Sequence, residues 1–169
     1  MKAPRVIVIM GVAGSGKTTI GTLLEHRHDG VFFDADDFHP KANVDKMAQG
    51  HPLNDDDRLP WLHRLRDEVI DPAPEGRITL LACSALKRSY RKILALDQPD
   101  VATVFLQGDV ETLGERISGR EGHYMKPGML TSQLDTLEAP PPEEALHVSI
   151  TRTPEEIADC IEAEFGLTQ

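Results

Sequence analysis

Short apolar runs alternate along this chain with longer segments in which apolar residues recur every three or four positions. The short runs are rich in β-branched residues and predict strands at 6–10, 31–33, 78–82, 101–106 and 146–150. The longer segments predict helices at 17–26, 41–49, 59–70, 86–96, 110–117, 129–137 and 154–165. Strands that are apolar throughout and separated by helices are typical of a parallel sheet covered on both faces. The pattern therefore predicts an α/β fold, a three-layer sandwich around a mostly five-stranded parallel sheet.

Two segments fit this alternation poorly. The stretch 38–70 is a charged helical insertion after the second predicted strand, and 118–128 is polar, irregular and punctuated by glycine. No linker or repeat divides the chain, so we expect a single domain over 1–169. Because loops on a rigid sheet commonly carry function, we expect the insertion to bind a substrate and 118–128 to form a mobile lid.

The first predicted strand leads directly into the run 11–18, G-V-A-G-S-G-K-T, which fits the phosphate-binding loop G-x-x-x-x-G-K-[ST]. Glycines let successive N–H groups surround phosphate oxygens, and the following helix adds the positive end of its dipole. Lys17 can reach the outer phosphates, and the Thr18 hydroxyl can ligate Mg²⁺. A glycine-rich turn that binds nothing is the alternative, but strand, loop and helix stand in the required order. The residues expected to contact ATP are Gly11, Gly14, Ser15, Gly16, Lys17, Thr18 and Thr19.

Charge and composition narrow the class of partner. The 169 residues carry a net charge of −10, which argues against nucleic acid because DNA binding usually needs a broad basic surface. No apolar run approaches the ~20 residues that span a bilayer, so we expect no membrane association. The two cysteines, Cys83 and Cys160, suit a reducing compartment, and the first strand leaves no room for a signal peptide, so we expect a cytoplasmic protein.

Carboxylates follow the second predicted strand. Asp34 and Asp36 are alternate residues, so an extended chain would point both toward the ligand crevice at the strand's carboxyl end. Phosphoryl transfer to an alcohol needs a group that orients the hydroxyl and anionic help in holding Mg²⁺. A solvated acidic turn is the alternative, above all for Asp37, which would face the other way. No Walker-B aspartate follows the third strand, so we expect metal help from Thr18 and these carboxylates, through water.

The insertion and the third strand supply candidates for binding an acceptor. His39 lacks a second His or Cys at ligand spacing, so we favour substrate contact over metal binding. Arg58 can hold a carboxylate through both arms of its planar guanidinium. One of the aspartates at 55–57 is expected to be the N-cap of the next helix. Trp61 is expected to pack the insertion, and Cys83 to be a small buried residue and no nucleophile.

Two arginines at the edge of 118–128 are candidates for neutralising charge. Arg116 and Arg120 lie one helical turn apart and can face the same ligand. An arginine supplied by a closing lid is a recurrent way to stabilise a phosphoryl group during its transfer. A basic helix end that interacts with its own dipole is the alternative.

Together these motifs resemble the gluconate kinases, small P-loop sugar-acid kinases related to the shikimate and nucleotide kinases. The resemblance extends from Val8 to about Ile150. Ala13 and Thr18 stand where serine is common in that family, and Thr18 still supplies a hydroxyl. Beyond the P-loop, the motifs are D-A-D-D-F-H-P at 34–40, K-M-A-Q-G-H-P-L-N-D-D-D-R-L-P-W-L at 46–62, C-S-A-L-K-R-S-Y-R at 83–91, R-E-G-H-Y-M at 120–125 and S-Q-L-D-T-L-E at 132–138.

The resemblance implies ATP- and Mg²⁺-dependent phosphorylation of D-gluconate at its 6-hydroxyl, giving 6-phosphogluconate and ADP, by a nucleotide-kinase-like fold that is often dimeric. It implies that Asp36 orients or deprotonates the acceptor hydroxyl, that Asp34 helps to hold the metal's water, and that Arg58 grips the acid. Arg116 and Arg120 would be the lid arginines. The candidate acceptor-binding residues are Asp36, His39, Arg58, Ser84, Lys87, Arg91 and His123, and Arg152 resembles a residue of the loop beside the adenine.

Several questions stay open at this level. The basic residue that joins Arg58 at the carboxylate is open among Lys87, Arg91 and Lys126. A kinase of another small acid, such as shikimate, or of a nucleotide is one alternative function. A nucleotide-dependent regulatory module is another, although the chain has no N-K-x-D guanine-reading motif and no D-x-x-G after a strand.

Overall fold

The chain forms one parallel sheet whose strands appear in the order β2-β3-β1-β4-β5. The computed structural model describes residues 3–118 and 127–167. The strands are β1 (Val6–Met10), β2 (Val31–Asp34), β3 (Thr79–Ala82), β4 (Val101–Gln107) and β5 (Leu146–Ser149). Every residue of the central strand β1 is buried, as expected for a strand paired on both edges and covered on both faces. The predicted five-stranded α/β architecture is therefore confirmed.

The helices lie close to their predicted positions, with differences at their ends. Their bounds are α1 (Lys17–His28), α2 (Lys41–Ala48), α3 (Asp55–Leu65), α4 (Arg88–Ile93), α5 (Val110–Ser118), α6 (Pro127–Thr136) and α7 (Pro154–Phe165), with a 3₁₀ turn η1 (Ala35–Phe38) and a π turn η2 (Arg66–Ile70). The predicted helix 59–70 thus starts four residues early and ends in a π turn, and the helix predicted at 86–96 is confined to α4. Thr153 caps α7 as part of a capping box.

The N-cap of α3 differs from the prediction. Asn54, and none of the three aspartates, caps the helix: its side-chain oxygen accepts from the Asp57 N–H at 2.8 Å. The Asp57 carboxylate in turn accepts from the Asn54 N–H at 2.9 Å, which completes a capping box. The reciprocal pair fixes where the helix begins, and it leaves Asp55 and Asp56 in the exposed first turn.

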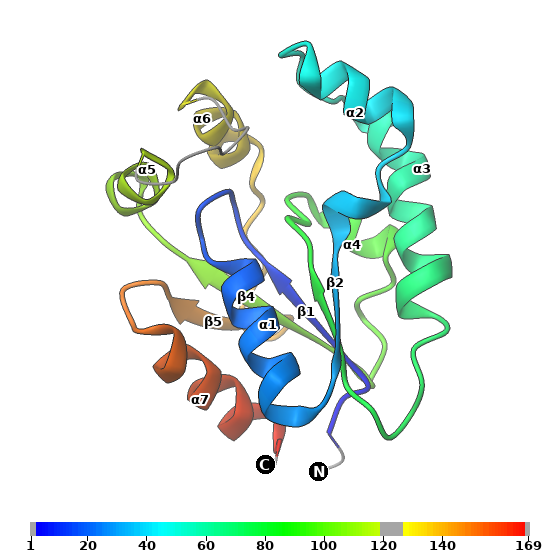
Figure 1. Ribbon diagram of the computed structural model, residues 1–169, viewed down its shortest axis with the longest axis vertical. Coiled ribbons are helices and arrows are strands. Elements are labelled where there is room, and N and C mark those ends of the chain that lie inside the picture. Colours follow the sequence, from blue (N-terminus) through cyan, green and yellow to red (C-terminus); the bar gives the residue numbers. More distant parts are fainter. Residues whose placement is uncertain (1–2, 119–126, 168–169) are drawn as a thin grey trace.

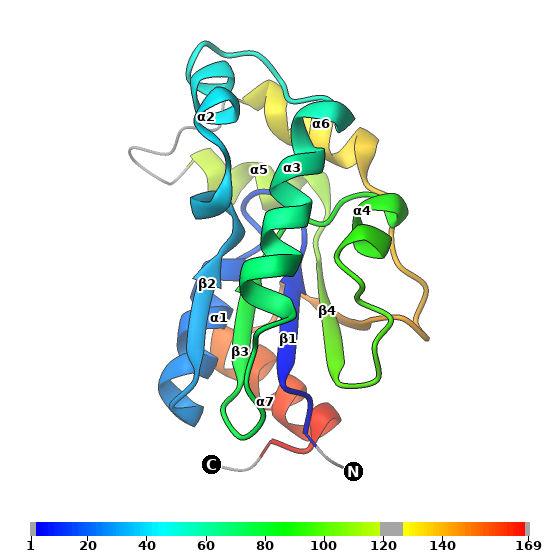
Figure 2. The same ribbon diagram turned by 90° about the vertical axis from the view of Figure 1, so that its right-hand side faces the viewer.

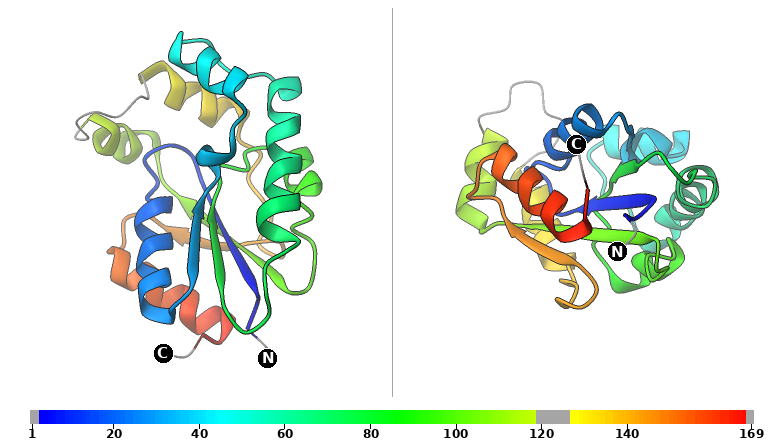
Figure 3. Two further views of the ribbon diagram at one scale, coloured as in Figure 1. Left: turned by 45° about the vertical axis from the view of Figure 1, so that its right-hand side comes forward. Right: turned by 90° about the horizontal axis from the view of Figure 1, so that it is seen from below.

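Two apolar cores, one on each face of the sheet, make the three layers. On one face, α3, η2 and α4 pack Trp61, Leu62, Ile70 and Tyr90 against the strands. On the other face, helices that include α1 and α7 pack Ile20, Leu24, Ile157 and Ile161. Figure 3 shows α1 and α7 lying side by side over their face of the sheet. The alternating sequence pattern reflects this double coverage.

The loops that leave the carboxyl ends of β1, β2 and β3 meet at one edge of the sheet. Figure 1 shows the loop between β1 and α1, the turn after β2 and the start of α4 at this edge, with α2 and α6 rising beyond it. Figure 2 shows α3 running down in front of the sheet from this edge, with α2 above it. Ligands of open α/β sheets bind at this edge, so the fold gathers the predicted motifs where a site is expected. Among the residues described, no helix is long and apolar enough to cross a membrane.

Candidate active site

The loop between β1 and α1 is built to receive an anion. Gly14 and Gly16 have φ angles of 80° and 97°, a conformation that side chains other than glycine rarely adopt. Gly16 is the N-cap of α1, and no side chain caps the helix. The first N–H groups of a helix need a partner, and the helix dipole makes an anion the favoured one. Thr18 and Thr19 are exposed in this first turn.

Lys17 lies folded over its own loop. Its Nζ donates to the carbonyl oxygens of Gly11 and Val12, at 2.9 and 3.1 Å. Ser15 is buried, and its Oγ has no hydrogen-bond partner in the described part of the chain. The loop is also held from outside, because the Ala13 N–H donates to Oε1 of Gln133 on α6 at 2.7 Å. An ammonium group in this position can donate to a phosphate oxygen in place of one of the two carbonyl oxygens.

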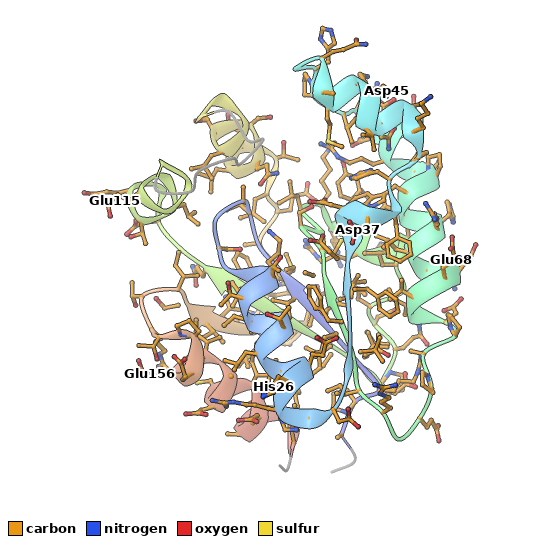
Figure 4. The ribbon with its side chains drawn as sticks, in the orientation of Figure 1. His26, Asp37, Asp45, Glu68, Glu115 and Glu156 are labelled. Carbon is orange, nitrogen blue, oxygen red and sulfur yellow. The ribbon has the colours of Figure 1, made fainter. Side chains whose placement is uncertain are left out.

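Asp34 and Asp36 come together through a turn. The prediction of an extended chain is wrong here, because η1 begins directly after Asp34. Asp34 caps this turn, and its Oδ1 accepts from the Asp36 N–H at 3.0 Å. Burial is the main cause that raises the pKa of Asp34, and the charges of Asp36 and Asp37 raise it further, while Lys17 lowers it. The Asp36 side chain is 84% exposed, and Figure 4 shows Asp37 at the same junction of β2 and the insertion.

The donor set at this edge fits Mg²⁺ bound with a nucleotide. Among the described residues, no group of three or more His, Cys, Asp or Glu side chains forms a metal cage. Mg²⁺ with ATP does not need one, since it keeps several waters and takes one or two protein oxygens besides the phosphates. Asp34 suits this duty because its carboxylate is half-buried next to two more carboxylates, and a cation relieves that repulsion.

His39 lies at the start of the insertion as a neutral, packed side chain. Its ring stacks on Trp61 with centroids 4.2 Å apart, and only 5% of its side chain is exposed. Asn43 Nδ2 lies 3.2 Å from His39 Nδ1 and also donates to the Asp57 carbonyl. An amide that donates to Nδ1 leaves the ring proton on Nε2, which lies 3.9 Å from Asp36 Oδ1. Burial, with help from the Arg58 charge, lowers the pKa of His39 to about 4.

Arg58 and Lys87 belong to one cluster that joins α3 to α4. Arg58 Nη1 donates to the Tyr90 hydroxyl at 3.0 Å, and Lys87 Nζ lies 2.9 and 3.1 Å from the two Asp55 oxygens. The Tyr90 hydroxyl donates a short hydrogen bond to Asp55 Oδ1. These bonds, from Tyr90 first and then Lys87, lower the pKa of Asp55. The structure thus brings together two of the cations predicted to meet the acceptor.

The loop 83–87 that precedes α4 is anchored by Arg91. This arginine is buried, and it donates from Nη1 to the Ala85 carbonyl and from Nη2 to the Glu138 carbonyl, both at 2.8 Å. Ser84 is half-buried in the same loop. Cys83 is the small buried residue expected, and burial raises the pKa of its thiol to about 12, so it is no nucleophile.

Other predicted positions lie apart from this cluster or outside the described residues. Arg120 and His123 fall within 119–126, which the structure does not describe, and so does most of the predicted lid. Arg116 lies on α5, and its side chain is likewise outside the description. Arg152 follows β5, where its Nη1 donates to Cys160 Sγ of α7 at 3.0 Å.

Three residues with direct contacts to the site were missed: Asp55, Tyr90 and Gln133. Helical spacing carried a signal for the first two. Asp55 lies three positions before Arg58 on α3, which places the two on one helix face, and Tyr90 lies three positions after Lys87, the N-cap of α4. Gln133 meets Ala13 across 120 positions of sequence, and no local pattern predicts such a contact.

Known proteins resemble the chain over most of its length. No family model matches it. The thermoresistant gluconokinase of Escherichia coli (strain K12) is 40% identical over 139 residues, 82% of this chain and 79% of that protein. A gluconokinase of Gluconobacter oxydans (strain 621H) is 42% identical over 157 residues, 92% and 88% of the two chains. The chain belongs to the gluconokinase family.

Solved structures agree with the membership of the gluconokinase family. The crystal structure of a gluconokinase from Sinorhizobium meliloti 1021 is 38% identical, with a TM-score of 0.85 over 98% of this chain and 94% of that one. The shikimate kinase of Aquifex aeolicus vf5, at 18% identity and a TM-score of 0.58, shares the fold. The resemblance inferred from the motifs is therefore confirmed, together with the kinase fold.

Proposed function

We propose that the chain transfers the γ-phosphoryl group of ATP to the 6-hydroxyl of D-gluconate, which gives 6-phospho-D-gluconate and ADP. The observation that supports this reaction most directly is the continuous row of groups from Lys17 to Arg58. Lys17 and Asp34 lie within electrostatic range of each other, Asp36 faces His39, and His39 feels the charge of Arg58. A phosphate loop at one end and a carboxylate-binding cation at the other suit a phosphoryl acceptor that is also an acid.

On the donor side, the loop N–H groups and Lys17 would hold the ATP phosphates, with Gly11, Gly14, Ser15, Gly16, Thr18 and Thr19 around them. Thr18, with Asp34 through water, would hold Mg²⁺. When bound, Mg²⁺ supplies positive charge that stabilises the transferring phosphoryl group. Arg116 and Arg120 would add positive charge from the lid at 118–128, and Arg152 would lie beside the adenine.

On the acceptor side, Asp36 would accept the hydrogen of the 6-hydroxyl and point its oxygen at the γ-phosphorus. Its side chain is 84% exposed, so an incoming hydroxyl can reach the carboxylate oxygens. Neutral His39 would hold its Nε2 proton toward Asp36 or a sugar hydroxyl. Arg58 would bind the carboxylate at the far end of the substrate. Ser84, Lys87 and His123 are the further candidates for contact with the acceptor, and Arg91 would act through the loop 83–87 that it anchors.

An acceptor panel tests this proposal. Purified protein with ATP and Mg²⁺ is offered gluconate, shikimate and nucleoside monophosphates, and ADP release is followed. We expect release to depend on gluconate and to be at least tenfold slower with the others. Release with shikimate or a nucleotide in its place would identify another kinase. Slow hydrolysis that no acceptor stimulates would identify a nucleotide-dependent regulatory module.

The proposal extends to the setting of the enzyme. We propose a cytoplasmic protein that forms a homodimer and has neither nucleic acid nor membrane as a partner. The net charge of −10 supports the absence of nucleic acid, since like charges repel. Both cysteines are free thiols, which suits a reducing compartment. Light scattering of the purified protein would measure the oligomeric state.

A further inference from the structure

The side chains between α3 and α4 form one chain of hydrogen bonds. Lys87 binds Asp55, Asp55 accepts from the Tyr90 hydroxyl, and that hydroxyl accepts from Arg58. A tyrosine hydroxyl has one hydrogen to donate, and here Asp55 takes it. The oxygen is therefore turned with its lone pairs toward Arg58. The ionised Asp55 thus sets the direction in which Tyr90 can accept.

The Arg58 guanidinium has N–H groups that are not used by Tyr90. Among the described residues, Tyr90 is the only hydrogen-bond partner of its guanidinium, and that bond uses one Nη1 hydrogen. The Tyr90 ring also lies under the guanidinium, 5.7 Å from its Cζ, which restrains the plane of the group. The remaining N–H groups form the planar fork that matches a carboxylate. A fork is specific only when its orientation is fixed, and Tyr90 restrains it through both its hydroxyl and its ring.

The charges of the cluster also suit a single carboxylate. Lys87 is 2.9 Å from Asp55, so the two charges largely cancel. Asp57, which also feels the Arg58 charge, is paired with Lys46 at 2.6 Å, so the cluster keeps one net positive charge, that of Arg58, for an incoming acid. Lys87 therefore has a partner inside the protein, which makes it a weaker candidate to join Arg58 at the carboxylate.

We propose that Tyr90 and Asp55 are positioning residues of the acceptor site, which hold the Arg58 guanidinium in the orientation that binds the carboxylate of the sugar acid. This inference rests on the proposed function for the identity of the acid. Tyr90 acts on Arg58 directly, and Asp55 acts through Tyr90.

The test compares Tyr90→Phe, Asp55→Ala and the double variant with the wild-type enzyme. Tyr90→Phe keeps the buried ring and removes both hydrogen bonds. We expect it to raise KM for gluconate about tenfold, the scale of one hydrogen bond to a charged group, with kcat and KM for ATP within about twofold of wild type. Asp55→Ala should raise the same KM by a similar factor. The double variant should be no worse than the worse single variant, because both changes break one chain of contacts.

Asp56→Asn is the matched control. Asp56 lies in the same first turn of α3, is exposed, and makes no hydrogen bond or ion pair with any residue that the structure describes. It should leave KM unchanged, which separates the role of Asp55 from the loss of a charge near the helix N-terminus. Thermal unfolding of each variant is measured in parallel, and exposed Asp55 keeps the test valid if Tyr90→Phe is unstable.

Two results would overturn the inference. One is a gluconate KM within twofold of wild type in Tyr90→Phe or Asp55→Ala, whatever the change in melting temperature. The other is a double variant whose KM rises by the product of the two single effects. A wild-type enzyme that ignores gluconate and phosphorylates another acid would contradict the proposed function alone, since the same KM ratios can then be measured with that acid.

Discussion

The indole Nε1 of Trp61 donates a hydrogen bond to the backbone carbonyl of Ala35 at 2.7 Å. Ala35 is buried and stands between the two carboxylates Asp34 and Asp36, so this bond ties the acidic turn to α3. Trp61 also carries the stacked ring of His39. A single side chain of the insertion thus positions the residues proposed to face the metal and the acceptor hydroxyl.

Trp61→Phe should therefore affect both stability and turnover. The variant keeps an aromatic ring under His39 but leaves the Ala35 carbonyl buried without its donor, which costs about 1–3 kcal/mol. For a domain of this size we expect the melting temperature to fall by about 2–4 °C for each kcal/mol. Because Ala35 sits between the carboxylates, kcat should fall as well. Calorimetry and steady-state kinetics measure the two effects, with Leu59→Ala, an exposed position on the same helix, as the control.

The sheet and the sequence motifs were predictable because both depend on residues that are close together in the sequence. Continuous apolar strands, helical periodicity and the glycine loop are each read from neighbouring residues. The turn after Asp34 was not, since alternation along the chain cannot distinguish an extended segment from a 3₁₀ turn held by an Asp34 cap and a distant Trp61. The Tyr90–Asp55 bond joins residues 35 positions apart, and only tertiary packing creates it.

Asp36→Asn tests the proposed role in orienting the acceptor. The amide is close in size but accepts a hydroxyl hydrogen poorly, and general-base assistance contributes about 10²–10⁴-fold, so kcat should fall by at least about 10². Binding of an ATP analogue, measured by calorimetry, should stay within twofold, whereas Lys17→Ala should lose both activity and nucleotide affinity. Asp37→Asn, the neighbouring exposed carboxylate, is the matched control. Near-wild-type kcat in Asp36→Asn would show that the role is wrongly assigned.

The lowered pKa of His39 predicts how the free energy of unfolding depends on pH. Its pKa is about 4 in the folded protein against 6.5 as its ordinary value, so the unfolded chain binds the extra proton first as pH falls. Stability from the neutral ring is therefore complete above pH 6.5 and is lost progressively between pH 6.5 and 4, up to about 3 kcal/mol at 1.36 kcal/mol per pH unit. His39→Phe keeps an aromatic ring on Trp61 and removes the group that takes up a proton.

Urea unfolding at pH 7.5 and pH 5 measures the effect. The wild type should lose more stability than His39→Phe between the two pH values, and the exposed His63→Gln should behave like the wild type. Equal losses in the wild type and His39→Phe would mean that the His39 ring takes up its proton as readily in the folded protein as in the unfolded chain.

The hydrogen bond from the Ala13 N–H to Gln133 predicts that a substitution of Gln133 changes ATP binding and leaves gluconate binding unchanged. Gln133→Leu removes the acceptor from the Ala13 N–H and frees the loop that would hold the phosphates. We expect KM for ATP to rise about threefold to tenfold, the scale of one hydrogen bond, with KM for gluconate unchanged. Ser132→Ala on the same helix, an exposed position, serves as the control. An unchanged KM for ATP would show that the loop keeps its shape without Gln133.

Arg91 is the position at which the structure favours an anchoring role over the direct substrate contact that the sequence left open. Ala85, whose carbonyl it binds, has a φ of 45°, an unfavourable conformation for a residue other than glycine, and such strain persists only where surrounding contacts enforce it. Arg91 reaches the Ala85 and Glu138 carbonyls with two different nitrogens of its rigid guanidinium, and the single ammonium group of a lysine does not reproduce that geometry.

Arg91→Lys should therefore destabilise the fold by about 1–3 kcal/mol for a carbonyl left without its donor. Because the loop carries Lys87, KM for gluconate should rise with the loss of melting temperature, and Arg88→Lys, an exposed neighbour, should change neither. Thermal unfolding and steady-state kinetics of the two variants decide the question. If Arg91→Lys lost gluconate affinity at an unchanged melting temperature, Arg91 would touch the substrate itself, because an anchor of a strained loop cannot be weakened without cost to the fold.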